Sequence, residues 1–355
     1  MPSSPTVGSP EGACLPAIAV TLGDPNGIGP DITLASWLGR KPRALHPFAV
    51  YGDPEVLEHR ARALGLDVPV ETVTHIRAAA QRFPTALPVV APTSTAQNRL
   101  LSADGDAAIV AALEQATMAA LDGAALALVT NPIAKKSLRS IPLEYPGHTA
   151  FLGQLAARYV GKATIRPVMM LVAAELKVVP VTVHIPISAV PHTLTRGLIA
   201  ETVRITAGAL RQDFGIRHPR IAVAGLNPHA GEGGLIGTEE RDIIAPAIAQ
   251  LAGAGLAVTG PHSADSLFHA DARHTYDAAI AMYHDQALIP LKTLAFDRGV
   301  NVTLGLPFVR TSPDHGTAFA LAGTGKARPD SFLAALQLAA ELGTRRAAAR
   351  ASAAQ

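Results

Sequence analysis

Apolar runs of strand length alternate with helix-like segments along most of the chain. The first such pair is AIAVTLG followed by DPNGIGPDITLASWL. Another is ALALVT followed by NPIAKKSL, where Asn131 can cap a helix and Pro132 fits its first turn. Near the end, PDSFLAALQLAAEL has the pattern of a helix capped by Asp330 or Ser331. This alternation predicts an α/β fold whose sheet is largely parallel.

Two segments depart from the simple pattern. Pro180 lies inside the apolar run LKVVPVTVHIP, and because proline cannot donate a ladder hydrogen bond, it predicts an edge strand or a strand break. The next segment, SAVPHTLTRGLIAETVRITAGALRQDF, has the pattern of one long amphipathic helix with a turn at its start. From Arg345 the sequence RRAAARASAAQ predicts a tail that frays from the last helix.

The length of the chain, 355 residues, predicts two domains. Residues 1–15 are rich in Gly, Pro and Ser and predict a disordered lead. The alternation of strands and helices continues without a linker, so we expect domains that share segments. The expected first α/β domain comprises residues 16–145 plus about 290–345, and the second comprises about 146–289.

Composition excludes several classes of protein. The formal net charge is +2 and no block of basic residues occurs, which gives no indication of nucleic-acid binding. No apolar run reaches the roughly 18 residues that a membrane-spanning helix needs, and the first residues lack the features of a signal peptide. The single cysteine, Cys14, cannot form an internal disulfide. We therefore expect a cytoplasmic protein with no nucleic-acid or membrane partner.

Three histidines each end an apolar, strand-like run. The runs are VVPVTVH, IAVAGLNPH and AAIAMYH, and they end at His184, His229 and His284. In an open α/β sheet, ligands bind outside the carboxyl ends of the strands. One strand-end histidine is more often a satisfied polar residue, but here the placement recurs three times, each time in a polar, Gly-rich or carboxylate-bearing loop. The pattern predicts a divalent metal with an open coordination position.

Two further turns carry candidate anion-binding groups. The turn LGDPNGIGP could direct backbone amides at an anion from a helix N-terminus, although a tight structural turn explains it equally well. The segment PGHTAF places together His148 and Thr149, which can both donate to a carboxylate or phosphate.

The last third of the chain adds charged candidates. Asp285, next to His284, could orient that histidine or join the metal ligands. Lys292 could pair with an anion or act as an acid or base, and the alternative is a solvated lysine. Arg310 follows an apolar stretch and could bind a phosphate or carboxylate with two nitrogens, unless it is a surface arginine.

Common cofactor and nucleophile fingerprints are missing. No G-x-G-x-x-G follows a strand, and no Walker A, H-E-x-x-H or G-x-S-x-G motif occurs. A dinucleotide would therefore bind without the usual Rossmann phosphate loop. The Gly-rich segment GLNPHAGEGGLIGTEE holds Asn227, His229 and Glu232, and its glycines permit close backbone approach to a ligand.

Together these stretches closely resemble the 4-hydroxythreonine-4-phosphate dehydrogenase family of the pyridoxal phosphate pathway. The resemblance runs from about Ile18 to Leu342, and the motifs occur in the family's order: GDPNGIGPD, TNPIAK, PGHTAF, GLNPHAGEGG, AMYHDQ, GVNVTLGLPFVRTSPDHGTA and LAGTGKA. The resemblance implies two α/β/α domains around a cleft, as in isocitrate and isopropylmalate dehydrogenases and unlike a Rossmann fold. It also implies a homodimer with its active site at the interface.

The resemblance assigns roles residue by residue. The family's metal ligands fall on the three strand-end histidines, which belong to the expected second domain. Its substrate contacts fall on His148, Thr149, Lys292, Asn301 and Arg310. The cofactor loop falls on the DHGTA and LAGTGKA stretch, with Asp314, His315, Gly316 and Thr317, and we add Asn227, Gly231 and Gly233. Lys292 and Asp285 are the candidates for the general base.

The implied reaction is oxidation of the 3-hydroxyl of 4-phosphooxy-L-threonine by NAD or NADP, with decarboxylation to 3-amino-2-oxopropyl phosphate. Imidazole ligands suit zinc best, while magnesium or cobalt stay open. Relatives in the family act on other phosphorylated sugar acids or on a dihydrodiol dicarboxylate, so the hydroxy acid is open too. Two functions of a different class also stay open, an acyl-phosphate transferase of the same fold and a protein that binds a metal or ligand without turnover.

Overall fold

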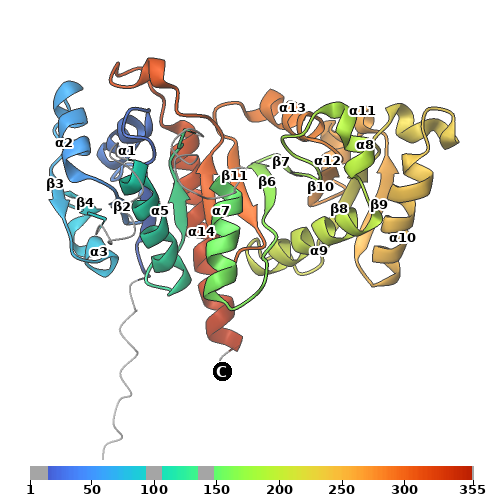
Figure 1. The fold of residues 1–355 in the computed structure, drawn as a ribbon, viewed down its shortest axis with the longest axis horizontal. Coiled ribbons are helices and arrows are strands. Elements are labelled where there is room, and N and C mark those ends of the chain that lie inside the picture. Colours follow the sequence, from blue (N-terminus) through green and yellow to red (C-terminus); the bar gives the residue numbers. More distant parts are fainter. Residues whose placement is uncertain (1–14, 93–105, 135–147, 354–355) are drawn as a thin grey trace, which may run out of the picture.

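One mixed sheet runs through the molecule, from β3 at one side to β9 at the other (Figure 1). The computed structural model describes residues 15–92, 106–134 and 148–353. The twelve strands among these residues are β1 (Ile18–Thr21), β2 (Phe48–Tyr51), β3 (Val70–Thr72), β4 (Leu87–Val90), β5 (Leu128–Thr130), β6 (Val168–Ala173), β7 (Leu176–Pro180), β8 (Arg220–Ala224), β9 (Ala257–His262), β10 (Ala278–Ala281), β11 (Val300–Leu304) and β12 (Arg310–Pro313). Their order across the sheet is β3-β4-β2-β1-β5-β12-β11-β6-β7-β10-β8-β9.

Helices fill most connections between the strands. The longer ones are α1 (Gly29–Leu38), α2 (Pro54–Ala63), α5 (Asp106–Leu121), α7 (His148–Tyr159), α9 (Arg196–Gln212), α10 (Ala245–Gly253), α13 (His284–Ala295) and α14 (Asp330–Ala353). The short ones are η1 (Ile76–Ala78), α3 (Ala79–Arg82), η2 (Ile187–Ala189), α8 (Val190–Thr193), η3 (Pro228–Gly234), η4 (Glu240–Ile244), α11 (Ala264–Leu267), α12 (Ala270–Arg273) and η5 (Phe319–Leu321). Among the described residues, no helix has the length and apolar character needed to cross a membrane.

The predicted α/β fold is confirmed, but the sheet is parallel only in its two flanks. β1 is parallel to β2 and β5, and β10 is parallel to β7 and β8. In the centre, β11 is antiparallel to both β12 and β6, and β6 is antiparallel to β7. Most of the pairings between the described strands are parallel, as predicted, and the three antiparallel pairings in the centre were not foreseen, because the sequence of a strand does not indicate the direction of its neighbours.

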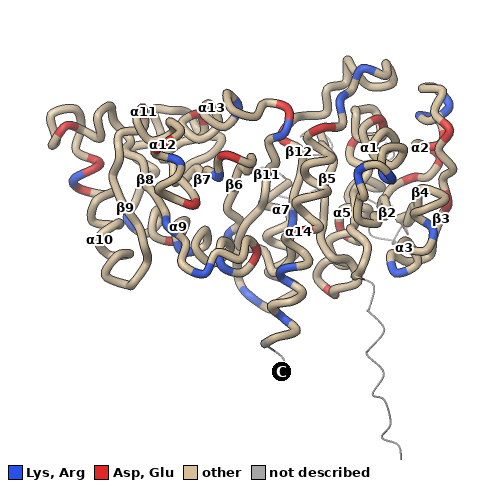
Figure 2. The backbone as a smooth tube through the Cα atoms, turned by 180° about the vertical axis from the view of Figure 1, so that it is seen from behind, with Lys and Arg blue, Asp and Glu red and all other residues tan. Residues whose placement is uncertain are grey.

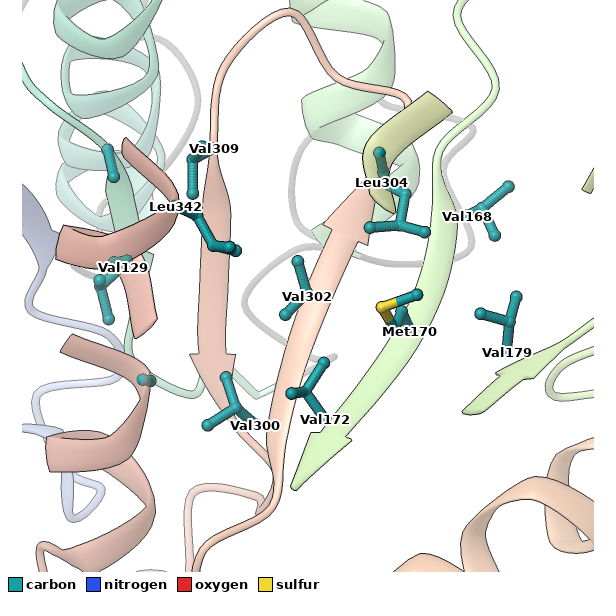
Figure 3. Packing of buried hydrophobic residues seen from close by; sticks show 14 of the residues in the cluster. Val129, Val168, Met170, Val172, Val179, Val300, Val302, Leu304, Val309 and Leu342 are labelled. Atoms are coloured by element: carbon teal, nitrogen blue, oxygen red, sulfur yellow. The ribbon is translucent and has the colours of Figure 1, made fainter. Parts of the chain in front are cut away.

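Both faces of the sheet are covered, which makes three layers. Side chains alternate along a strand, so in β1 Ile18 and Val20 join a buried cluster with α1 and α2, whereas Ala19 joins one with α5. The first cluster continues through the antiparallel centre, where Val302 of β11 lies beside Met170 and Val172 of β6 (Figure 3). The core is therefore shared by both flanks of the sheet.

The segment containing β11 and β12 returns late in the chain to lie between β5 and β6. The strands of residues 16–130 lie on one side of this segment, and those of residues 168–281 lie on the other. This order is compatible with a discontinuous first domain, although the predicted domain boundaries stay a prediction. Residues 1–14 of the expected lead, and most of the helix expected in NPIAKKSL, lie outside the described residues.

Three local predictions have clear outcomes. Pro180 is the last residue of β7, an interior strand, so the strand break is confirmed and the edge position is wrong. The long helix is α9, preceded by the turn of η2 and α8. The frayed tail is wrong, because α14 continues to Ala353.

Arginines at the end of α14 explain why the helix continues. Arg345 donates to Phe214 O at 2.6 Å, and Arg350 donates to Pro307 O at 2.6 Å. Between them, Arg346 forms a buried two-pronged ion pair with Asp213, at 2.7 and 2.6 Å. Figure 2 shows this basic stretch of α14 in an otherwise mixed distribution of charges.

We expect Arg346→Met to lower the free energy of unfolding by about 3–5 kcal/mol, because it leaves the Asp213 carboxylate buried without a partner. Urea unfolding followed by circular dichroism measures the change. The double variant Arg346→Met/Asp213→Leu removes both charges and should recover most of the loss. A double variant as unstable as the single one would contradict the role given to the ion pair.

Candidate active site

Two of the three predicted metal histidines come together beyond the ends of neighbouring strands. His184 follows β7, and His284 begins α13 just after β10. Their ring centroids lie 5.4 Å apart. Both rings line a cavity of about 200 Å³ together with Thr182, Tyr283 and Asp285. The structure therefore places these two side chains where the strand-end pattern put them, and their role as ligands stays a prediction.

Asp285 orients the ring of His284. Its Oδ1 lies 2.7 Å from Nδ1 of His284, while the rest of the carboxylate is exposed. A histidine whose Nδ1 is engaged in this way presents its Nε2, which is the usual arrangement of a metal ligand. The donor set of imidazoles with a carboxylate behind one of them fits a borderline-soft divalent ion such as zinc.

His229 lies in a left-handed turn, η3. The backbone has positive φ at five consecutive residues, 50° at His229, 51° at Ala230, 77° at Gly231, 45° at Glu232 and 70° at Gly233. Each residue with a Cβ costs about 1–2 kcal/mol in this conformation. Within the described part of the chain, no group of three or more His, Cys, Asp or Glu side chains is placed to hold a metal ion. Among the described residues the structure pairs His184 with His284, and the role of His229 as the third ligand stays a prediction.

Two buried polar side chains hold the start of this turn. Glu240 accepts from the backbone N–H groups of Leu226 and Asn227, each at 2.7 Å. Gln286 donates from Nε2 to Gly225 O at 2.8 Å and accepts from Met282 N at 2.7 Å. Gln286 thus ties the segment after β8 to the segment after β10.

Arg310 is a buried cation without an anionic partner among the described residues. The residue is 3% exposed, and its Nη1 and Nη2 donate to Thr303 Oγ1 at 2.8 Å and Thr130 Oγ1 at 2.6 Å. Its Nε is buried and has no hydrogen-bond partner. Burial lowers the pKa of the guanidinium to about 10, which leaves it charged at neutral pH. A buried charge of this kind requires a compensating anion.

The other predicted substrate contacts gather near Arg310. Nε2 of His148, at the start of α7, and Oδ1 of Asn301 on β11 are buried without partners. Burial first, and the Arg310 cation second, lower the pKa of His148 to about 3, so its ring is neutral at neutral pH. Asn301 shares a face of β11 with Thr303, which binds Arg310. Thr149 is the next residue of α7 and is half-buried.

Lys292 lies against Asp314 rather than free in solution. Its Nζ is 2.6 Å from Asp314 Oδ2 and donates to Asp314 O at 2.8 Å. The aromatic ring of Phe296 lies 5.2 Å from the same ammonium. The solvated alternative is therefore excluded, and the pairing connects a predicted substrate residue with a predicted cofactor residue.

The Gly-rich turn after β1 lies against the loop after β12. Ile28 N donates to Thr317 O at 3.0 Å. Arg60 pairs with Asp31, whose other oxygen accepts from Gly323 N at 2.8 Å. The motifs GDPNGIGPD, DHGTA and LAGTGKA, distant in sequence, therefore form one surface.

The remaining predicted cofactor residues divide between two places. His315 and Gly316 belong to the loop after β12, where His315 Nδ1 lies 3.0 Å from Gly316 O. Asn227, Gly231 and Gly233 belong instead to the turn of His229. The Asn227 amide donates to Glu239 at 2.8 Å and to Glu240 at 2.9 Å, so its donors are already used.

The sequence did not single out the residues that hold these groups. They are the partners of Arg310, of the His229 turn and of the Gly-rich turn: Thr130, Thr303, Glu240, Gln286, Asp31 and Arg60. Most of them bind partners far away along the chain, which no local pattern reveals. In the sequence, Glu240 could have been found as part of the acidic pair that ends GLNPHAGEGGLIGTEE, and Gln286 as the glutamine of the motif AMYHDQ.

The fold is that of an α/β protein, and the buried polar groups around Arg310 form a candidate site for a small anionic molecule. Residues 44–339 match the family described as pyridoxal phosphate biosynthetic protein PdxA, and the chain belongs to this family. The family predicted from the motifs is therefore confirmed.

Individual relatives agree over nearly the whole chain. A protein of Methylorubrum extorquens named 4-hydroxythreonine-4-phosphate dehydrogenase is 53% identical over 332 residues, which is 92% of this chain and 95% of the relative. The solved structure of such an enzyme from Burkholderia phymatum is 36% identical, with a TM-score of 0.75 over 92% of this chain and 98% of that one. A terephthalate 1,2-cis-dihydrodiol dehydrogenase from Burkholderia xenovorans is 29% identical, with a TM-score of 0.60 over 92% and 98%.

The neutral His148 predicts a stability that depends on pH. In the unfolded chain its pKa is about 6.5, and in the folded chain it is about 3. Between these values only the unfolded chain takes up the proton, so stability should fall as pH falls from about 6.5 toward 3, by at most about 1.4 kcal/mol per pH unit. The measurement is urea unfolding across this range.

The comparison that isolates this contribution uses His148→Gln, whose stability should depend less steeply on pH. The same substitution at the exposed His192 serves as the control and should leave the slope of the native protein unchanged. Equal slopes for the native protein and His148→Gln would show that the buried ring is not held neutral.

Proposed function

We propose that this protein is a divalent-metal-dependent 4-hydroxythreonine-4-phosphate dehydrogenase. The reaction takes 4-phosphooxy-L-threonine and NAD⁺ (or NADP⁺) to 3-amino-2-oxopropyl phosphate, carbon dioxide and the reduced cofactor. It belongs to pyridoxal 5'-phosphate biosynthesis. Family membership and the names of the relatives support the reaction. A cytoplasmic location stays a prediction from the sequence.

The observation that carries the proposal is the unpaired, buried Arg310. Its free Nε lies near the neutral ring of His148, and Asn301 contributes a further unpartnered buried atom. A phosphate or carboxylate would supply the missing negative charge and accept hydrogen bonds from this set. The substrate proposed here carries both groups, and Arg310, His148, Thr149 and Asn301 would bind its anionic and polar ends.

The histidines would hold the divalent ion, with zinc as the first choice and magnesium or cobalt as alternatives. When bound, the ion would polarise the substrate hydroxyl and the carbonyl oxygen formed from it. Asp285 would keep His284 in the required tautomer through its 2.7 Å contact. Asp285 and Lys292 both stay candidates for the general base, because each is already engaged, Asp285 by His284 and Lys292 by Asp314.

We further propose a homodimer whose active site combines two protomers. β5 and β12 run in one direction, whereas β7 and β10 run in the opposite one, because three antiparallel pairings separate them. The carboxyl ends that lead to Thr130 and Asp314 therefore lie at one edge of the sheet, and those that lead to His184 and His284 lie at the other. A second chain would bring the two edges together.

Turnover should require both the metal and the phosphorylated substrate. We expect NADH formation with 4-phosphooxy-L-threonine to stop when a chelator is added and to return with added zinc, magnesium or cobalt. The dephosphorylated hydroxy amino acid should react far more slowly, because it lacks one of the two anionic groups that the site would bind. The test panel includes a dihydrodiol dicarboxylate, and turnover of that compound alone would move the protein to the other branch of its family.

A shared site predicts complementation between two inactive variants. His284→Ala and Arg310→Met should each abolish activity as homodimers. A heterodimer isolated with two different affinity tags should regain about half of the native activity, because one of its two symmetric sites would then be intact. A heterodimer as inactive as its parents would place the whole site in one protomer. Two tags on native protomers provide the reference activity.

A further inference from the structure

The left-handed turn that carries His229 lies directly against a buried carboxylate. Glu240 is 5% exposed, and a Cβ added to Gly231 would come 2.6 Å from its Oε2. A Cβ added to Gly225 would come 3.0 Å from Oε1 and 2.9 Å from Cα of Ala230. Both positions therefore need glycine so that the turn can pack on the carboxylate.

All the hydrogen bonds of this carboxylate go to the segment that leads into the turn. Oε1 accepts from Leu226 N and Asn227 N, each at 2.7 Å, and Oε2 accepts from the Asn227 amide at 2.9 Å. Among the described residues, Glu240 has no basic partner. Hydrogen bonds from N–H groups to an ionised acceptor are short and strong, and here they are what offsets the burial of the charge.

The same segment is fixed to the other histidine element. Gln286 binds Gly225 O and Met282 N at 2.8 and 2.7 Å, and it lies two positions after His284 on α13. The chain between β8 and His229 is thus held on one side by Glu240 and on the other by the helix that carries His284. A backbone strained at three non-glycine residues, His229, Ala230 and Glu232, keeps its shape only where the surroundings fix it.

We propose that Glu240 is a positioning residue, which holds His229 in the left-handed turn in the orientation that binds the divalent ion. The inference rests on the proposed metal-dependent function. Glu240 does not touch the ion. Its negative charge acts through the backbone amides of Leu226 and Asn227.

The test is Glu240→Gln in the full-length protein, with two measurements. Hydrogen exchange of the metal-free protein should become about tenfold faster or more within residues 226–236 and stay unchanged elsewhere, because the amide group of glutamine turns a donor toward the Asn227 amide or a backbone N–H. Zinc affinity, measured by competition with a chromophoric chelator, should fall about 10- to 100-fold. The matched control is Glu239→Gln. The carboxylate of Glu239 binds the Asn227 side chain and Thr238 N but not the backbone amides of Leu226 and Asn227. This control variant should keep its zinc affinity within about twofold of the native protein.

Gly231→Ala provides a second route to the same effect. Its Cβ would push the turn off the carboxylate, so zinc affinity should fall while Glu240 itself is intact. Unchanged exchange or unchanged zinc affinity in Glu240→Gln would overturn this proposal alone. Native protein that binds no zinc, magnesium or cobalt would overturn the metal site and this proposal with it. Faster exchange together with weaker zinc binding in both variants would support the positioning role.

Discussion

The reversal of strand direction in the centre of the sheet is the constraint on which the rest of the structure depends. β12-β11-β6-β7 are joined by antiparallel pairs, whereas the flanking strands pair in parallel. Because of the reversal, β5 and β12 in one flank run in the direction opposite to β7 and β10 in the other. Valines and leucines of these strands fill a common core, so a slip by one residue would move Val300, Val302 and Leu304 to the wrong face (Figure 3). Register here fixes which polar groups reach each edge of the sheet.

Glu240 and Arg310 are buried charges of opposite sign, and the structure offsets the cost of burying each of them in a different way. Glu240 is surrounded by N–H donors that lie in its own chain, so its charge is satisfied in the isolated molecule. Among the described residues, Arg310 binds two threonine hydroxyls and keeps one unpartnered nitrogen. The first arrangement stabilises a strained turn. The second leaves a buried positive charge without a compensating anion among the described residues, and this is the basis of the proposed anion site.

The sequence predicted the elements well and their partners poorly. Apolar runs revealed β7, β8 and β10, and with them the placement of His184 and His284 after strand ends. The orientation of Arg310 depends on Thr130, which is 180 positions away, and nothing near either residue indicates that pairing. The length of α14 was missed because its last turns are held by arginines that bind other elements, not by its own pattern. Local periodicity therefore predicts which strand or helix carries a side chain. Contacts between distant parts of the chain decide which partner that side chain binds.

The late return of β12 to the side of β5 has a consequence for the nascent chain. β5 ends at Thr130, and its partner strand begins at Arg310, after 180 further positions. At the usual rates of synthesis the ribosome needs roughly 10–40 s to cover that distance. Throughout this interval β5 presents an unpaired edge, the kind of surface on which chains aggregate. The fold can close only when the last quarter of the chain emerges, so a ribosome that stalls before β12 would release a half-sheet with an open edge.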